Sequence, residues 1–407
     1  MTRRRVAITG LGVVCSHGDD PAVVFDAMCA GRNAVRVDFG SHVPVAAADF
    51  NPSRWLTGMQ HIGMDRVSQF AIAAAESAKA DAGWLADHDL WSAERIGIYV
   101  GTGFGGTDSV SEAYRRFHQK ARIPPLSVVA AMANAPAAHI AMRTGVTGPV
   151  LTYSIACASS SVAIAAGAKD IAIGEIDAAL VGGCEAELLA PMIATWEAMM
   201  TLAKARQADP SASSRPFSAS RSGLVLGEGA AFLMIEDLDG ARRRGARIYA
   251  EIAGTGLSCD AAHLAKPQVK GQVQAMRSAI RSAGLDVADV GYCNAHGTAT
   301  MVGDVVEAES IRAVWGDDLA GLRVSSTKAL HGHLLGAAGA LETLITTLAV
   351  HRHQVPVQAN CEDPDPACDI PLVLGASEDH PTLRAAICNS FAFGGTNSSL
   401  VLGAVEH

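Results

Sequence analysis

The stretch from Tyr153 to Glu187, YSIACASSSVAIAAGAKDIAIGEIDAALVGGCEAE, contains almost no large side chains. Small residues fill it, and Lys169 and Asp170 interrupt its apolar run. Because small side chains allow neighbouring backbones to approach closely, this composition predicts a buried helix. Cys157 lies where a strand-like run enters that helix. The stretch therefore raises one question: whether Cys157 is a nucleophile or one more small residue of a tight core.

Apolar strands that close in glycine turns recur along the first half of the chain. They are predicted at Arg5–Val14, Arg95–Gly106 and Ala178–Glu187, with a fourth in GAAFLMIEDL. An alanine-rich helix with a glycine stop is predicted over Met64–Trp84. Strands that alternate with helices indicate an α/β protein in which helices cover a sheet.

The second half repeats this pattern. Arg247–Asp260 resembles the opening strand with its Gly-x-Gly turn, and the helical run QVQAMRSAIRSAGL and the strand-like run VGYCNAHGTAT follow it. We therefore expect two related α/β halves, residues 1–250 and 251–407. The polar run Arg206–Gly223 is expected to be a long surface loop. The Gly-x-Gly at Gly10–Gly12 lacks the third glycine and the acidic residue of a dinucleotide site, so we do not read it as one.

Composition excludes several classes of protein. Of 407 residues, 49% are hydrophobic and 18% charged, which indicates a globular chain, and the net charge of −9 argues against general nucleic-acid binding. The nine cysteines are scattered, odd in number and without a CxxC pair, so we expect reduced thiols. The N-terminus is typical of a first strand rather than a signal peptide, and no uninterrupted apolar run is long enough to span a membrane. We therefore expect a cytoplasmic protein.

Four segments carry residues suited to chemistry, and the first is SIACASSS. A thiol at a helix N-terminus is made more acidic by unpaired N–H groups and the helix dipole, which would make Cys157 a better nucleophile. The alternative is a packed core cysteine, because free cysteines are often buried. From this segment alone both interpretations stay open. Cys184, near the other end of the stretch, is expected to be a core residue.

The second segment is Asn294–Ile311, in which His296 follows a short apolar strand and stands in a Gly/Thr turn. Asp304 and Glu307 follow at the start of a helix, where acidic side chains favour the dipole. A histidine in such a place is either a group that projects into a cleft or a structural residue.

The third segment is Ser325–Leu344, where Lys328 and His333 precede a helix with a Gly/Ala face that permits close packing. His331 and His333 would suggest a metal site, but alternate residues of a turn seldom share one ion. No Cys or acidic partner lies at a useful spacing either, so we expect no metal. The fourth segment, Cys388–Gly403, holds a Gly-Gly turn between apolar strands. Its N–H groups are free to face a developing oxyanion, although an ordinary hairpin has the same pattern.

Taken together, these segments resemble the elongating β-ketoacyl-[acyl-carrier-protein] synthases of the thiolase superfamily. The resemblance covers essentially the whole chain. It rests on the motifs ACASSS at Cys157, SSRPFSASRSGLVLGEGA at Ser213–Ala230, AHGTATMVGD, STKALHGHLLGAAG and NSFAFGGTN. It implies a duplicated thiolase core of five layers, α-β-α-β-α, that is usually dimeric.

The resemblance also implies a set of catalytic roles. Cys157 matches the nucleophile that carries the acyl chain as a thioester. His296 and His333 match the pair that decarboxylates a malonyl thioester and stabilises the enolate. The backbone N–H groups of Cys157 and Phe393 match the oxyanion hole. The implied mechanism needs no bound cofactor or metal, because the substrates arrive on the phosphopantetheine of acyl carrier protein.

Supporting residues follow from the same resemblance. Lys328 is expected to pair with Glu307 and to order the site electrostatically, with Asp304 beside them. Thr298 and Thr300 match positions that hydrogen-bond the phosphopantetheine arm.

Aromatic residues are expected around the acyl pocket. Phe393 matches a gating aromatic and Phe391 lies beside it. Ala392 replaces the usual Gly between them, which is expected to stiffen the gate. Phe104 stands where the family often has a smaller aliphatic residue, so we expect it to restrict the acyl pocket.

The expected activity is condensation of an acyl group with malonyl-[acyl-carrier-protein] to give 3-oxoacyl-[acyl-carrier-protein] and CO2, in fatty-acid or specialised polyketide or polyene biosynthesis. The alternatives are a non-catalytic partner subunit of a ketosynthase heterodimer and an acyl-CoA thiolase. Expected partners are an acidic carrier protein, docked at Arg66, Lys204 and Arg206, and a second subunit that is either identical or resembles a chain-length factor. Chain length and pathway are not determined by these motifs.

Overall fold

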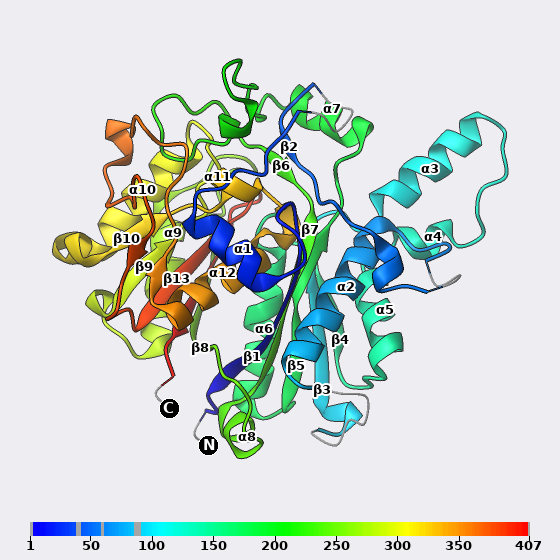
Figure 1. The fold of residues 1–407 in the computed structure, drawn as a ribbon, viewed down its shortest axis with the longest axis horizontal. Helices are drawn as coiled ribbons and strands as arrows, with labels where there is room; N and C mark the ends of the chain where they lie inside the picture. The colour runs from blue at the N-terminus through cyan, green and yellow to red at the C-terminus, as the bar shows by residue number, and fades with distance from the viewer. Residues whose placement is uncertain (1–2, 38–41, 58–60, 85–90, 406–407) are drawn as a thin grey trace.

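Two sets of five strands form the framework of the molecule (Figure 1). The computed structural model describes residues 3–37, 42–57, 61–84 and 91–405. The first set consists of β1 (Val6–Val14), β3 (Ile96–Gly101), β4 (Val150–Tyr153), β5 (Ala178–Glu185) and β7 (Gly229–Asp237). The second set consists of β8 (Ala250–Cys259), β9 (Val290–Asn294), β10 (Arg323–Ser325), β13 (Ala385–Phe391) and β14 (Thr396–Gly403).

Both sets have the same topology. The first runs β4-β3-β5-β7-β1 and the second runs β10-β9-β13-β14-β8, so each places its strands in the same spatial order. In each set the first three strands of that order pair in parallel and the last two pairings are antiparallel. The sets meet where β1 and β8 pair antiparallel, at Ile8 and Ala250. The expected duplication is therefore present in the strand order, while the domain boundary at residue 250 stays a prediction.

Helices cover both sets and fill the space between them. The middle layer holds α6 (Ser159–Ile173) and α12 (Ala338–Arg352), which contact each other and strands of both sets. The outer layers are α2 (Arg66–Asp81) with α5 (Ala135–Thr144) on the first set, and α9 (Val269–Ala283) with α10 (Gly303–Trp315) on the second. These are the five α-β-α-β-α layers expected for a thiolase-like fold.

Paired glycines bring one outer helix of each half, α2 and α9, close to the first strand of that half. A Cβ at Gly12 would overlap the carbonyl oxygen of Ala74 in α2, and a Cβ at Gly256 would overlap that of Ala275 in α9. The two Gly-x-Gly motifs therefore occupy equivalent places in the two halves. Their role is close helix–strand packing, which agrees with our rejection of a nucleotide site at Gly10–Gly12.

The small-residue stretch forms the buried helix that its composition predicts. A Cβ at Gly101 would overlap the backbone of Ser160, so β3 and α6 approach closely only because side chains are missing between them. In the described part of the chain, Ala156–Ile173 is the one stretch long and apolar enough to cross a membrane, and 67% of it is buried inside the protein. That burial is typical of the core helix of a folded domain. Cys184 is also fully buried, in β5, as expected for a core residue.

The remaining elements lie around these layers. At one edge of the sheet, beyond β4, an arm projects from the body of the molecule, with α3 as its longest helix (Figure 1). The other short elements are α1 (Pro21–Cys29), α3 (Thr107–His118), α4 (Ser127–Ala131), α7 (Ala190–Ala198), α8 (Leu238–Arg243), α11 (Lys328–His331), the pair β2 (Val45–Ala46) and β6 (Leu226–Gly227), and the pair β11 (Gln354–Val355) and β12 (Glu378–Asp379).

Candidate active site

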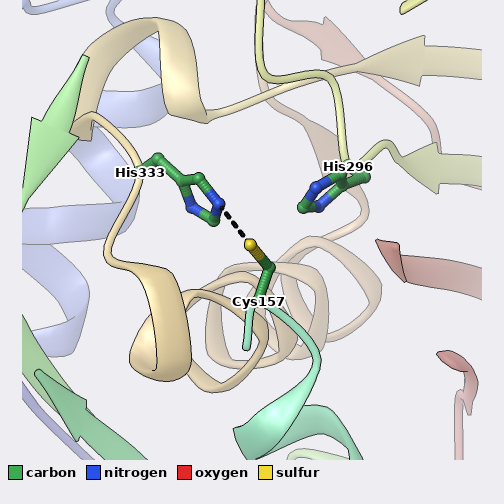
Figure 2. A group of neighbouring side chains, drawn as sticks. All are labelled: Cys157, His296 and His333. Atoms are coloured by element: carbon green, nitrogen blue, oxygen red, sulfur yellow. Dashed lines mark hydrogen bonds between the residues drawn. The ribbon is translucent and has the colours of Figure 1, made fainter. Parts of the chain in front are cut away.

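Cys157 lies in the junction between β4 and α6, just before the N-terminus of the helix. The junction is tight: Ala156 has a φ of +43°, and the Ser159 hydroxyl accepts a hydrogen bond from the Ile155 N–H at 2.8 Å. Only 6% of Cys157 is exposed. Figure 2 shows its sulfur pointing between the side chains of His333 and His296.

His333 is held by backbone on both sides and bonds the sulfur. Its backbone N–H donates to the Val225 carbonyl at 2.7 Å, and its backbone carbonyl accepts from the Gly227 N–H at 2.9 Å. The ring nitrogen Nε2 lies 3.0 Å from Cys157 Sγ (Figure 2). Because the Leu335 N–H donates to Nδ1 at 3.3 Å, we assign the proton of the neutral ring to Nε2. His333 therefore donates to the sulfur rather than accepting its proton.

His296 follows β9 and faces His333 almost edge-on, with ring centroids 5.4 Å apart and planes at 84°. A single carboxylate fixes its turn, since Glu307 accepts the N–H groups of His296 at 2.8 Å and Gly297 at 2.7 Å. The His296 Nδ1 atom is buried and has no hydrogen-bond partner among the residues that the structure describes. The ring thus offers a hydrogen-bonding nitrogen to whatever occupies the site.

Burial sets the protonation states of these three groups. It raises the pKa of Cys157 to about 11, although the Lys328 charge acts in the opposite direction. It lowers the pKa of both His296 and His333 well below 6.5, and Lys328 lowers both further. The resting site is therefore a neutral thiol beside two neutral imidazoles. Our expectation of an acidic thiol at the helix N-terminus is wrong for the free enzyme, because desolvation outweighs the helix terminus.

Lys328 forms an ion pair with Glu342 of α12. The expectation that it pairs with Glu307 is therefore wrong. Both side chains of this ion pair are 1% exposed. Glu307 instead has its oxygens taken by backbone N–H groups, and burial raises its pKa to about 7. Glu342 escaped notice because it lies in an apolar run; a lone acid in such a run is itself a signal, since glutamate is seldom buried without a partner.

The Gly-Gly turn forms a hairpin between β13 and β14, as predicted. Gly394 and Gly395 have φ values of +91° and +79°, and Ala392 has no positive φ, so an alanine is tolerated there in this conformation. The backbone N–H groups of Phe393 and Cys157 both donate toward the Cys157 sulfur. Two amides therefore lie close to the sulfur at which an acyl group would be held. Their role as an oxyanion hole, which requires them to face the carbonyl oxygen of that group, stays a prediction.

A cavity of about 280 Å³ leads to the sulfur. Thr298, Thr300, Asp304 and Glu307 line it, together with the aromatic rings of Phe391, Phe393 and Trp196. Trp196 lies outside the four sequence segments and stacks on Phe393 with ring centroids 6.2 Å apart.

Phe104 is the one predicted pocket residue that the structure does not bring to this cavity. Its side chain is 47% exposed in the single chain, and it is absent from the cavity lining. Its backbone N–H donates to the buried carboxylate of Glu185 at 3.3 Å, which fixes the turn after β3. The assignment of Phe104 to the acyl pocket stays a prediction.

The polar run Arg206–Gly223 is only in part the surface loop that we expected. Its second half is folded into the protein: Phe217 is fully buried, and its N–H donates to Asp304 at 2.8 Å. Ser222 and Gly223 line the cavity. The prediction failed because serines and arginines in this run satisfy neighbouring backbone groups instead of water, a distinction that composition does not show.

The three candidate docking residues differ in their surroundings. Arg66 forms an ion pair with the buried carboxylate of Glu228, at 2.7 Å, so much of its charge is neutralised. Lys204 and Arg206 are exposed. The backbone N–H of Lys204 donates to the hydroxyl of Ser222, a cavity residue, at 3.1 Å, which places the Lys204 backbone next to the cavity lining.

The Cys157–His296–His333 group has donor atoms within 4.8 Å of one another, a spacing that a metal ion could bridge. The donors themselves fit a cation poorly. The Leu335 N–H on Nδ1 leaves the His333 Nε2 protonated, and the buried Lys328 ammonium that depresses both imidazole pKa values would also repel a cation. His331 bonds the Thr327 hydroxyl at 3.0 Å. We therefore assign no metal to this group.

Comparison with known proteins agrees with this geometry. Residues 3–241 match the model of the beta-ketoacyl synthase N-terminal domain, and residues 249–362 match that of the C-terminal domain. The chain is 38% identical to nodulation protein E of Rhizobium meliloti (strain 1021) over 98% of each chain. It is 35% identical to 3-oxoacyl-[acyl-carrier-protein] synthase 2 of Coxiella burnetii over the whole of both.

Solved structures of the same kind superpose closely. The ishigamide ketosynthase/chain length factor aligns with a TM-score of 0.92 at 32% identity, over 99% of this chain and 100% of that one. A type II PKS acyl-carrier protein in complex with its ketosynthase aligns with a TM-score of 0.90 at 27% identity, over 99% and 100%. The family models alone cover well over half of the sequence, and this chain belongs to the β-ketoacyl synthase family.

Proposed function

We propose that this chain condenses an acyl group with malonyl-[acyl-carrier-protein] to give 3-oxoacyl-[acyl-carrier-protein] and CO2, with Cys157, His296 and His333 as its catalytic residues. The observation that carries the assignment of residues is the bond between Cys157 Sγ and His333 Nε2 at 3.0 Å, at the base of a cavity that His296 shares. Enzymes of this family are acyltransferases, which agrees with a nucleophile buried at the end of a channel.

The first half-reaction transfers the acyl group to Cys157. The sulfur attacks the carbonyl carbon of the acyl thioester, and the N–H groups of Cys157 and Phe393 stabilise the oxyanion. Collapse of this intermediate breaks the bond to the carrier's sulfur, and the carrier leaves as a thiol with the proton from Cys157. Because the resting thiol has a raised pKa, the N–H of His333 assists by stabilising negative charge as it develops on the sulfur.

The second half-reaction makes the carbon nucleophile without a strong base. Loss of CO2 from the malonyl thioester leaves an enolate, whose oxygen accepts hydrogen bonds from the two neutral imidazoles. The enolate carbon attacks the thioester on Cys157, which forms the new carbon–carbon bond and returns the sulfur as a thiolate. The depressed pKa of both histidines keeps them neutral, so they act as hydrogen-bond donors rather than as acids.

The substrates are proposed to arrive on the phosphopantetheine arm of an acyl carrier protein. The threonine-lined cavity supports this, as do the exposed Lys204 and Arg206, the first of which is hydrogen-bonded through its backbone to the cavity residue Ser222. A second subunit, identical or resembling a chain-length factor, is proposed to cover the edge strand β4 and the projecting arm. That arm exposes large apolar side chains, among them Tyr114 at 65%, Phe117 at 66% and Val128 at 70%.

Intact-mass measurement tests the catalytic assignment. After incubation with an acylated carrier protein, the wild-type chain should gain the mass of one acyl group, and Cys157→Ala should gain none. Cys259→Ala, which removes the exposed thiol of β8, is the matched control and should still be acylated. Addition of malonyl carrier protein should then discharge the adduct as 3-oxoacyl product and CO2.

Two results would count against the proposal. A wild-type chain that accepts no acyl group from any donor would indicate a non-catalytic partner subunit. An adduct that persists in Cys157→Ala would place the nucleophile elsewhere.

A further inference from the structure

Arg221 is a buried arginine whose guanidinium is committed almost entirely to backbone. Its side chain is 1% exposed. Nη1 donates to the Ser218 carbonyl at 2.9 Å and pairs with Asp365 at 2.6 Å. Nε donates to the Thr300 carbonyl at 3.1 Å, and Nη2 donates to the Met301 carbonyl at 2.9 Å. One planar guanidinium thus donates to four acceptors in fixed directions, which a lysine ammonium could not reproduce.

The turn at residues 298–301, to which Arg221 donates, has an unusual backbone conformation. Ala299 has a φ of +64°, a left-handed conformation that is costly for a residue with a Cβ. The Ala299 carbonyl accepts from Gly223 N–H at 3.0 Å. Three consecutive carbonyls, those of residues 299–301, are therefore held by Arg221 and Gly223. Because a strained turn persists only where its surroundings determine it, these bonds are what maintain its shape.

This turn presents the threonine hydroxyls to the cavity. The Oγ1 atoms of Thr298 and Thr300 lie 3.1 Å apart, and both residues line the channel to the nucleophile. The buried Asp304 carboxylate accepts the Phe217 N–H at 2.8 Å and also the backbone N–H groups of Thr298 and Thr300 in the turn. The turn is thus fixed from two directions, with its hydroxyls left to face whatever fills the channel.

We propose that Arg221 is a positioning residue for the arm of the substrate, acting through the turn at residues 298–301. By fixing the Thr300 and Met301 carbonyls it sets the direction of the two threonine hydroxyls, and so the affinity for a pantetheine-linked substrate. This rests on the proposed function, since it takes the channel to be the path of that arm. The hydrogen bonds of Arg221 go to Ser218, Thr300, Met301 and Asp365 and to none of the three reacting side chains, so its effect falls on binding more than on chemistry.

A general structural role is the competing explanation, because the same segment also supports the catalytic histidine. Val225 and Gly227 hold the backbone of His333, four and six residues beyond Arg221. If Arg221 merely kept this segment folded, its loss would disturb His333 and slow the chemistry at Cys157. The two explanations therefore differ in which kinetic constant changes.

Steady-state kinetics with acyl-pantetheine and malonyl-pantetheine separate them. In Arg221→Lys, which keeps the charge beside Asp365, we expect KM to rise tenfold or more with kcat within threefold of wild type. The rate at which iodoacetamide alkylates Cys157 should stay within twofold, because this small reagent needs no arm. The matched control is Arg277→Lys. It alters a 2.8 Å hydrogen bond from the Arg277 guanidinium in α9 to the Ala313 carbonyl in α10, and it should leave KM and kcat unchanged.

A double-mutant comparison tests whether the effect passes through the threonine turn. If it does, Arg221→Lys added to Thr298→Val/Thr300→Val should raise KM little more than the two threonine changes alone, because these already remove both hydroxyls that Arg221 positions. Independent, multiplying effects would overturn the proposal, as would a fall in kcat with unchanged KM. If Arg221→Lys does not fold, Asp365→Asn leaves the arginine in place, loosens its anchor and should give the same rise in KM in smaller measure.

Failure of this inference is distinguishable from failure of the proposed function. A wild-type chain that makes no 3-oxoacyl product would refute the function, whereas a wild type that condenses and an Arg221→Lys variant with unchanged KM would refute only the role of Arg221.

Discussion

At the scale of single residues, desolvation decides the behaviour of the site. The three reacting groups are buried together with one ammonium ion, and the energetic cost of a charge in that environment keeps the thiol and both imidazoles neutral. The Lys328–Glu342 ion pair lies beside them, and the Lys328 charge lowers the pKa of both imidazoles. Catalysis is therefore expected to depend on hydrogen bonds donated by the neutral imidazoles rather than on a preformed thiolate.

The pH dependence of alkylation checks this interpretation. Iodoacetamide reacts with the thiolate, so its rate at Cys157 should increase about tenfold per pH unit while the pH is below the pKa, and should level off only near pH 11. The measurement is peptide-level mass spectrometry in a Cys259→Ser background, which removes the exposed thiol. A rate that is already constant at pH 8 would show that the helix terminus, and not burial, controls the sulfur.

At the scale of elements, close approach of helix and strand controls the positions of the catalytic loops. The outer helices α2 and α9 contact β1 and β8 through Gly-x-Gly motifs, and α6 contacts β3 through Gly101. These contacts fix the distance between each helix layer and its strands. The loops that carry Cys157 and His296 follow β4 and β9, so their positions depend on that distance. Small residues in strands therefore act on the site through the packing of whole elements.

A methyl group at Gly256 should destabilise the protein. In Gly256→Ala the new Cβ would overlap the Ala275 carbonyl of α9, and overpacking of this kind costs about 1–3 kcal/mol. The free energy of unfolding in urea should fall by that amount. The control is Gly321→Ala, where a Cβ meets nothing within 4 Å and φ is not positive; its stability should stay the same or rise slightly. Equal stability of the two variants would refute the close-packing account.

At the scale of the whole molecule, docking of the proposed carrier protein depends more on where the charges lie than on the net charge. The chain carries a net charge of −9, yet its proposed partner is acidic, so attraction must come from a local patch at the cavity mouth. Lys204 and Arg206 are exposed, whereas the charge of Arg66 is offset by Glu228. Docking is therefore expected to depend on the first two residues more than on the third.

Charge reversal tests the patch. Lys204→Glu/Arg206→Glu should lower kcat/KM for carrier-bound acyl groups about tenfold at low salt, and less at high salt, because screening weakens the attraction. The value for acyl-pantetheine should stay within twofold, since that substrate carries no acidic protein. Lys169→Glu/Arg281→Glu makes the same change in net charge at exposed positions on other elements and should have little effect. Equal losses in the two double variants would assign the effect to net charge.

The sequence by itself determined the two-fold repetition of strands and helices, the burial of the small-residue helix, and the segments that carry Cys157, His296 and His333. Each of these depends on local periodicity or on a short motif, which a single segment contains in full. It did not determine that Lys328 pairs with Glu342, that the thiol pKa is raised, or that Arg221 holds the threonine turn. Those outcomes depend on which distant segments meet in a dry interior. Only tertiary packing decides which partner a buried charge finds and how much water it loses.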